Sequence, residues 1–98
     1  MAIEILPYDG SEYFEDEAGQ LELLAEAFET GDAALISHAL GVVARARGMT
    51  SIARDAGVTR EALYKALSDK GDPKLSTLLG VMKALGVRLA AQPAVPAE

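Results

Sequence analysis

The sequence predicts an all-α domain, and three observations lead to this fold class. Half of the 98 residues are hydrophobic but only 5% are aromatic, so the core must consist mainly of Ala, Leu and Val. Apolar residues recur at spacings of three and four, which is the spacing of one helix face. Ser, Thr or Asp stands at the start of these stretches and Gly at their ends, where helices prefer them. We therefore expect five or six helices around one core.

The first predicted helix covers residues 17–29 and is strongly acidic. Asp16 is placed to cap it, and acidic residues in its first turn suit the helix dipole. Thr30 and Gly31 end it. The apolar stripe expected to face the core comprises Leu21, Leu24, Ala25 and Phe28.

The second predicted helix runs from residue 33 to about 47. Asp32 is its expected cap, and Gly48 is expected to close it. Arg45 and Arg47 stand in the last turn, where cations are favoured. The broad apolar face comprises Leu35, Ile36, Ala39, Leu40, Val43 and Ala46.

Residues 50–68 have the spacing of a helix–turn–helix, in which the second helix lies in the major groove of DNA. Thr50 is expected to cap the first short helix, which ends near residue 56, and Thr59 to cap the second, which starts at residue 60. Gly57 allows the left-handed backbone of the turn. Small Ala53 permits a close helix crossing, while Val58, Leu63 and Leu67 supply apolar contacts under the second helix.

The remaining sequence predicts a loop, a last helix and an irregular end. Gly71 and Pro73 interrupt helical structure, so the last helix is expected to open at Ser76 or Thr77 and to end near Leu85. Alternation over residues 87–91 predicts one short strand, which would pair with a strand at residues 3–6, either within the chain or across a dimer. The expected organisation is an acidic segment at 1–32, a core at 33–89 and a flexible tail at 90–98.

The charges of this chain are segregated along the sequence. Residues 1–34 hold ten acidic and no basic residues, whereas residues 35–98 hold nine basic and five acidic residues. Charged surfaces act locally because salt screens them beyond about 8 Å. The basic half, which holds the helix–turn–helix, is thus suited to phosphate despite a net charge of −6. The acidic half is a candidate surface for a basic partner, or simply a solubilising surface.

Composition disfavours several classes of function. The chain has no Cys and one His, His38, so disulfides and thiolate or His-cluster metal sites are not expected. The sequence has no apolar run long enough to span a membrane and no secretory signal, so we expect a cytoplasmic location. Enzymatic activity and cofactors are not expected either, because the sequence shows no catalytic constellation and no phosphate-cradling loop.

The residues expected to contact DNA lie at the start of the second short helix. Arg60 suits a bidentate contact with guanine, or alternatively a phosphate. Tyr64 suits a thymine methyl, a phosphate or a structural role, and Glu61 either a cytosine amino group or the helix dipole. Lys65, Lys70 and Lys74 suit phosphates, and Thr50 and Thr59 can each cap a helix and bond a phosphate. The complete predicted DNA-binding set is Thr50, Thr59, Arg60, Glu61, Tyr64 and Lys65.

The segments ALGVVARARGMTSIAR, GVTREALYKALS, GDPKLSTLL and KALGVRL carry a family resemblance. Together they resemble the Xre/Cro, lambda-repressor-like helix–turn–helix proteins, and more narrowly the HigA-like antidote proteins of toxin–antitoxin addiction modules. The amino-terminal YDGSEYFEDE and the acidic helix after it are similar to that family as well. One position departs from many such domains, because Met49 stands where they carry a Gln that supports phosphate binding.

The resemblance implies an antitoxin of a type II module. Such a protein neutralises a small, often basic toxin of the RelE/ParE superfamily, and binds its own operator DNA as a homodimer to repress its operon. Two alternatives remain open from the sequence: a repressor of the Xre/Cro type without a toxin, and an interaction module that has lost DNA binding.

Overall fold

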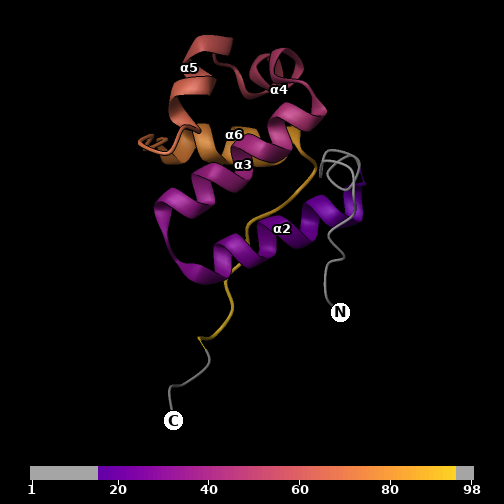
Figure 1. The fold of residues 1–98 in the computed structure, drawn as a ribbon, viewed down its shortest axis with the longest axis vertical. Coiled ribbons are helices and arrows are strands. Elements are labelled where there is room, and N and C mark those ends of the chain that lie inside the picture. Colours follow the sequence, from indigo (N-terminus) through magenta and orange to yellow (C-terminus); the bar gives the residue numbers. More distant parts are fainter. Residues whose placement is uncertain (1–15, 95–98) are drawn as a thin grey trace, which may run out of the picture.

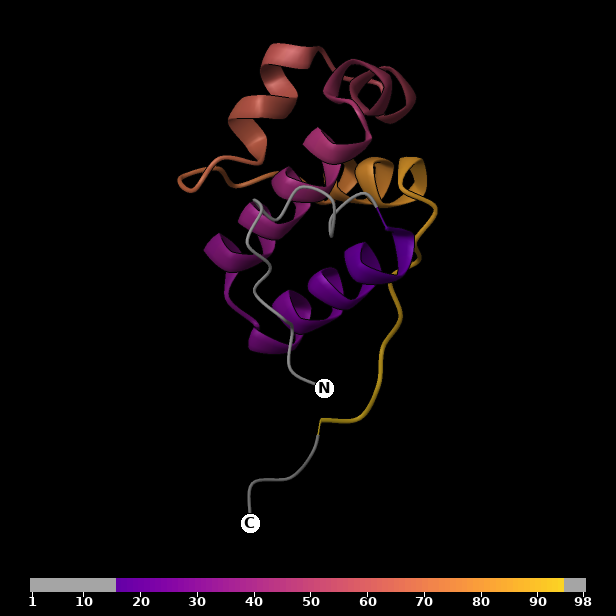
Figure 2. The same cartoon turned by 45° about the vertical axis from the view of Figure 1, so that its right-hand side comes forward.

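The computed structural model describes residues 16–94, and within them the chain is all-α, as predicted (Figure 1). No strand occurs in this part of the chain. The helices are, in order, α2 (Glu17–Thr30), α3 (Ala33–Arg47), α4 (Met49–Ala56), α5 (Arg60–Ala66) and α6 (Leu75–Ala84). Helix α2 packs along α3, and α4 contacts α3, α5 and α6. Figure 2 shows α4 and α5 at one end of the molecule, with α2 at the other.

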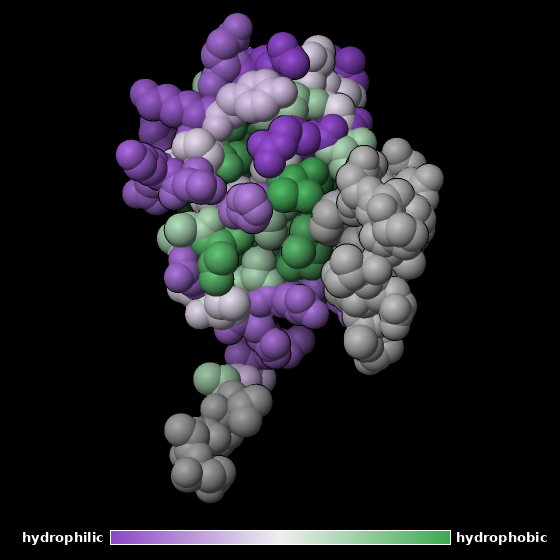
Figure 3. Space-filling view, in the orientation of Figure 1, coloured by the Kyte–Doolittle hydropathy of each residue, from purple (hydrophilic) through white to green (hydrophobic). Residues whose placement is uncertain are grey.

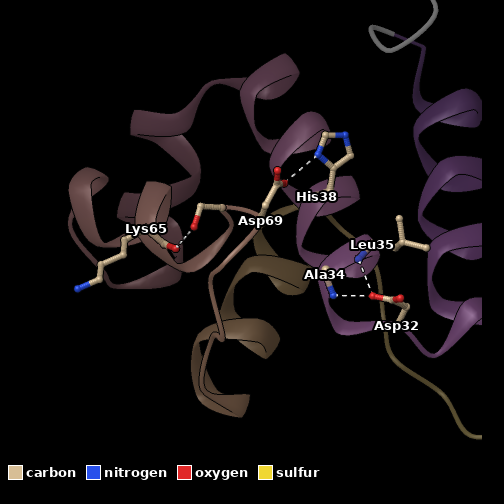
Figure 4. A network of polar contacts seen from close by, with 7 residues as sticks. Asp32, Ala34, Leu35, His38, Lys65 and Asp69 are labelled. Carbon is tan, nitrogen blue, oxygen red and sulfur yellow. Dashed lines mark hydrogen bonds and ion pairs between the residues drawn. The ribbon is translucent and has the colours of Figure 1, made fainter.

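Asp16 and Asp32 cap α2 and α3 as the sequence predicts. The Asp16 carboxylate accepts a hydrogen bond from the amide of Ala18 at 3.3 Å. The Asp32 carboxylate accepts from the amides of Ala34 and Leu35 at 2.9 and 3.2 Å (Figure 4). Each bond satisfies an amide that has no partner within the helix.

Helices α3 and α4 meet at a single residue, Gly48, which corrects the predicted start of α4. Gly48 ends α3 and also stands at the N-cap of α4, with φ of 111°. Thr50 therefore lies inside the first turn of α4 and does not cap it. The expectation assumed a separate connection of ordinary length, but a glycine at positive φ turns the chain within one residue.

The turn between α4 and α5 agrees with the sequence. Gly57 adopts the left-handed conformation, with φ of 78°. Thr59 caps α5, and its hydroxyl accepts a hydrogen bond from the amide of Ala62 at 3.0 Å. The turn thereby fixes the direction in which α5 leaves the core.

The carboxyl-terminal part differs from expectation in two respects. Helix α6 begins at Leu75, one residue after Pro73, with extended Lys74 at its N-cap, and so Ser76 and Thr77 lie in its first turn. Residues 87–94 form no strand. A strand needs a second strand beside it to pair its backbone groups, and residues 16–94 contain no such strand. The other predicted strand, at residues 3–6, lies outside the described residues.

The core is formed by all five helices and includes α2. Leu63 and Leu67 point inward as expected and are 0% and 3% exposed. Gly80 of α6 lies so close to α4 that a Cβ there would stand 3.1 Å from the carbonyl oxygen of Ala56. The buried hydrophobic residues are Leu24, Ala27, Ala39, Leu40, Val43, Ala44, Met49, Ile52, Ala53, Leu63, Leu67, Val81, Met82 and Leu85.

The predicted apolar faces of α2 and α3 were partly wrong. In α2, Leu24 is buried and Phe28 partly buried, but Leu21 and Ala25 are exposed. The buried set is Gly19, Gln20, Leu24 and Ala27. In α3, Leu35 and Ala46 are exposed, whereas Ser37, Gly41 and Ala44 are buried.

Arg47 explains why α2 is turned this way. Its Nε donates a hydrogen bond of 2.6 Å to the Oε1 of Gln20, which is only 2% exposed. Its Nη1 donates a second bond of 3.0 Å to the carbonyl oxygen of Leu85. One guanidinium therefore connects α3 with α2 and with the end of α6. Because Gln20 must face it, Leu21 is directed outward.

Candidate nucleic-acid interface

Helix α5 is short and mostly exposed, and two leucines on its inner side are buried in the core. Leu63 and Leu67 hold it on the core. The predicted contact residues Thr59, Arg60, Glu61, Tyr64 and Lys65 are all exposed. A helix seated in this way can present its first turns to a groove of DNA without losing its own packing.

One side of α5 borders a hollow of about 520 Å³, which we call the arginine hollow. It is surrounded by three guanidinium groups, two hydroxyl side chains of α4 and the ring of Tyr64. No acidic residue lines it. It lies at the start of α4, where free backbone amides and the helix dipole also favour an anion. Its lining residues are Arg45, Gly48, Met49, Thr50, Ser51, Arg54, Arg60 and Tyr64.

Two of these arginines are oriented by neighbours. Arg60 lies over the ring of Tyr64, with 5.2 Å from its Cζ to the ring centroid, and its Nη2 donates to the Tyr64 hydroxyl at 3.4 Å. Arg54 donates to the carboxylate of Asp55 at 3.2 Å and to the hydroxyl of Ser51 at 3.3 Å. Arg60 is thus held by a neutral partner and keeps its full charge for a ligand, whereas the charge of Arg54 is partly balanced.

The other side of α5 borders a second hollow, of about 540 Å³, which we call the lysine hollow. Three lysines and one acid, Asp72, contribute charge to it. Its lining residues are Val58, Ala62, Lys65, Ala66, Ser68, Lys70, Gly71, Asp72, Pro73, Lys74 and Thr77. Helix α5 therefore lies between two basic depressions, one on each side.

The structure brings most of the sequence-predicted residues to these hollows. Arg60, Tyr64 and Thr50 line the first, and Lys65 lines the second together with Lys70 and Lys74. Thr59 and Glu61 lie at the exposed start of α5 and line neither. Met49 is 5% exposed and belongs to the core, so its place in α4 is explained by packing.

Sequence reasoning missed three residues of the arginine hollow. Arg45, Ser51 and Arg54 come from α3 and α4 and join Arg60 only because Gly48 sets the angle between those two helices. Their basic or hydroxyl character was visible in the sequence, but their shared direction was not. The part of the surface over α4 and α5 is mostly hydrophilic (Figure 3).

The acidic residues of α2 and its caps lie elsewhere. Six acidic residues occur within residues 16–34, and all of them are exposed. None of them borders the arginine or the lysine hollow. Glu17 borders a separate depression at the start of α2. The charge segregation of the sequence therefore persists as separate surfaces in the fold.

His38 lies on the surface beside one acidic residue. Its Nδ1 lies 3.5 Å from the carboxylate of Asp69, and the two side chains are 61% and 84% exposed (Figure 4). An exposed pair of this kind contributes little to stability. Among the described residues no group of three or more His, Asp or Glu side chains could hold a metal ion. No helix within residues 16–94 is long and apolar enough to cross a membrane.

Comparison with known proteins places the chain in a family. A sequence model of the family described as "probable addiction module antidote protein" matches residues 4–93. This match covers nearly the whole chain. The chain belongs to the addiction-module antidote family. Its role is accordingly that of an antitoxin, and membership implies a toxin as partner.

The chain is also similar to a protein from Haemophilus influenzae described as uncharacterized. The two are 42% identical over 92 residues, which is 94% of this chain and 95% of the relative. No solved structure matches. The antidote family thus supplies the general role, while the surfaces described above supply the hypotheses on how that role is carried out.

Proposed function

We propose that this antidote has two binding activities. In the cytoplasm it neutralises a small basic toxin of the RelE/ParE type, and as a homodimer it binds operator DNA through a HigA-like, Xre/Cro-type helix–turn–helix to repress its own operon. Both activities are stoichiometric binding, with no reaction chemistry.

The position of α5 between the arginine and lysine hollows is the observation that supports the proposal of DNA binding. A helix in the major groove has a phosphate backbone on each side of it. The arginine hollow suits one backbone and the lysine hollow the other. Glu61, and Arg60 at the border of the arginine hollow, stand at the exposed start of α5, from which both can reach base edges. A protein that contacted DNA on one side alone would have no need of the second basic surface.

Arg60→Ala is expected to weaken binding to the specific operator by about 1–3 kcal/mol. The arginine can make a bidentate contact with guanine, and Tyr64 holds it in place without neutralising it. Titration of the wild type and the variant with the chain's upstream DNA and with scrambled DNA measures the effect. Arg88→Ala is the matched control, because Arg88 is exposed and borders neither hollow.

The two DNA sequences separate base reading from phosphate binding. A loss confined to the operator indicates that Arg60 reads a base, and an equal loss on both indicates a phosphate contact. If Arg60→Ala bound the operator as tightly as Arg88→Ala, the proposed orientation of α5 would be wrong.

Lys65→Ala is expected to reduce the salt dependence of DNA binding. Each phosphate contact adds about 0.9 to the slope of log K against log salt, so the variant should lose about one unit of slope and weaken on all sequences alike. Equilibrium titrations at several salt concentrations measure the slope. Lys83→Ala, which removes an exposed lysine outside both hollows, should leave the slope unchanged. An unchanged slope for Lys65→Ala would remove the lysine hollow from the interface.

The homodimer and the toxin are tested separately. A dimer predicts protection of two half-sites about 34 Å apart, or a multiple of that distance, in a footprint of the operator. The toxin partner predicts a complex with the product of the reading frame adjacent to this gene. A single protected half-site, or no complex, would contradict the corresponding part of the proposal.

A further inference from the structure

The outer face of α2 is apolar in the middle and acidic at its edges. Ala18, Leu21 and Ala25 are exposed and lie on one stripe of the helix, given its 3.6-residue period. Leu21 is 55% exposed, which is high for a large apolar side chain on a structured helix. On the same period Glu17 flanks one edge of the stripe, and Glu22, Glu26 and Glu29 flank the other. We call this surface the α2 face.

A depression of about 300 Å³ adjoins the α2 face at the start of the helix. Ala18 and Leu21 form one wall, and Leu24 and Val87 add further apolar surface. Arg47 and Gln20, which also line it, are bonded to each other. The depression therefore has the size and lining to receive one aliphatic or aromatic side chain beside Leu21.

We infer that the α2 face is the docking surface for the toxin, and that the toxin presents a basic segment with one apolar anchor side chain. This inference rests on the proposed function and narrows it to particular residues. The occupant is identified by charge, because α2 contains four glutamates and no Lys or Arg. The same charge argues against the other candidates. Two copies of this acidic face would repel each other, and the face would also repel a nucleic acid.

The apolar and acidic parts of the α2 face have different effects on binding. Burial of Leu21 and of the anchor stabilises the formed complex, so it determines the dissociation rate. The glutamates remain at the rim in solvent, where charges mainly accelerate the encounter of opposite partners. Only the second effect should weaken as salt rises.

Leu21→Gln tests the apolar part in the full chain. The glutamine keeps the side-chain length and a good helix propensity, and since Leu21 is exposed the fold should persist, as circular dichroism can verify. With the purified product of the adjacent reading frame as probe, we expect dissociation to accelerate by about tenfold or more. Leu79→Gln is the matched control, because Leu79 is 46% exposed on α6, a helix without acidic residues.

A triple variant, Glu22→Gln with Glu26→Gln and Glu29→Gln, tests the acidic part. Association should slow by about tenfold at low salt and lose most of its salt dependence. Asp69→Asn is the control for charge removed elsewhere, because Asp69 is exposed after α5 and borders neither the arginine nor the lysine hollow. DNA binding by the Leu21 and triple variants should equal that of the wild type.

The possible outcomes distinguish a wrong docking surface from a wrong toxin partner. If the wild type binds the probe and the Leu21 and triple variants bind it equally well, the α2 face is wrong while the antitoxin role stands. If the wild type itself does not bind, the assigned toxin partner fails, and this docking surface fails with it. A loss for Leu79→Gln equal to that for Leu21→Gln would also overturn the assignment.

Discussion

Leu63→Ala is expected to lower the free energy of unfolding by about 2–5 kcal/mol. Leu63 is 0% exposed and, together with Leu67, holds α5 on the core. Truncation removes apolar burial and leaves a cavity under a helix of only seven residues, which cannot keep its structure by itself. Urea denaturation followed by far-UV circular dichroism measures the loss.

Two variants control for this effect. Leu63→Met conserves volume and should cost less than about 1.5 kcal/mol. Glu61→Ala, two residues earlier and exposed, should change stability by no more than about 0.5 kcal/mol. A small loss for Leu63→Ala, comparable with that of Glu61→Ala, would mean that α5 is not seated as described.

Arg47→Ala is expected to lower the free energy of unfolding by about 2–3 kcal/mol. The substitution removes two hydrogen bonds, at 2.6 Å to Gln20 and at 3.0 Å to the carbonyl of Leu85, and takes a charged donor from the buried Gln20 side chain. The loss should be accompanied by loosening of α2, measurable as faster amide hydrogen exchange in residues 20–28.

Arg45→Ala is the matched control for Arg47→Ala. Arg45 lies on the same helix about half a turn earlier, is exposed, and carries the same charge. Removing its side chain should therefore change the free energy of unfolding very little. A double-mutant cycle with Gln20→Ala isolates the pair, and we expect a coupling of about 1 kcal/mol or more. Additive effects of Arg47→Ala and Gln20→Ala would show that the two side chains do not stabilise each other.

The sequence predicted the local features of this fold well. The all-α class, the caps Asp16, Asp32 and Thr59 and the turn at Gly57 are confirmed. Each depends on a few neighbouring residues, so residue type and spacing suffice to recognise it. The inward Leu63 and Leu67 followed from the same periodicity.

The starts of α4 and α6 were missed locally, but two other missed features depend on contacts between residues far apart in the sequence. Apolar periodicity put both Leu21 and Leu24 on the buried side of α2, but only Leu24 is buried, because the bond from Arg47 to Gln20 turns the helix. The arginine hollow depends on the angle at Gly48, which brings α3 beside the start of α4. The DNA-contact residues and the organisation into segments 1–32, 33–89 and 90–98 remain predictions for the experiments above.

The shared core has a consequence for genetics. Since α2 and α5 are both anchored in one hydrophobic core, a random lesion in the interior should abolish both proposed activities, toxin neutralisation and operon repression, in one step. Lesions on the two outer surfaces should instead yield separable alleles, each defective in one trait. A screen scoring both traits would therefore sort mutations into interior and surface classes.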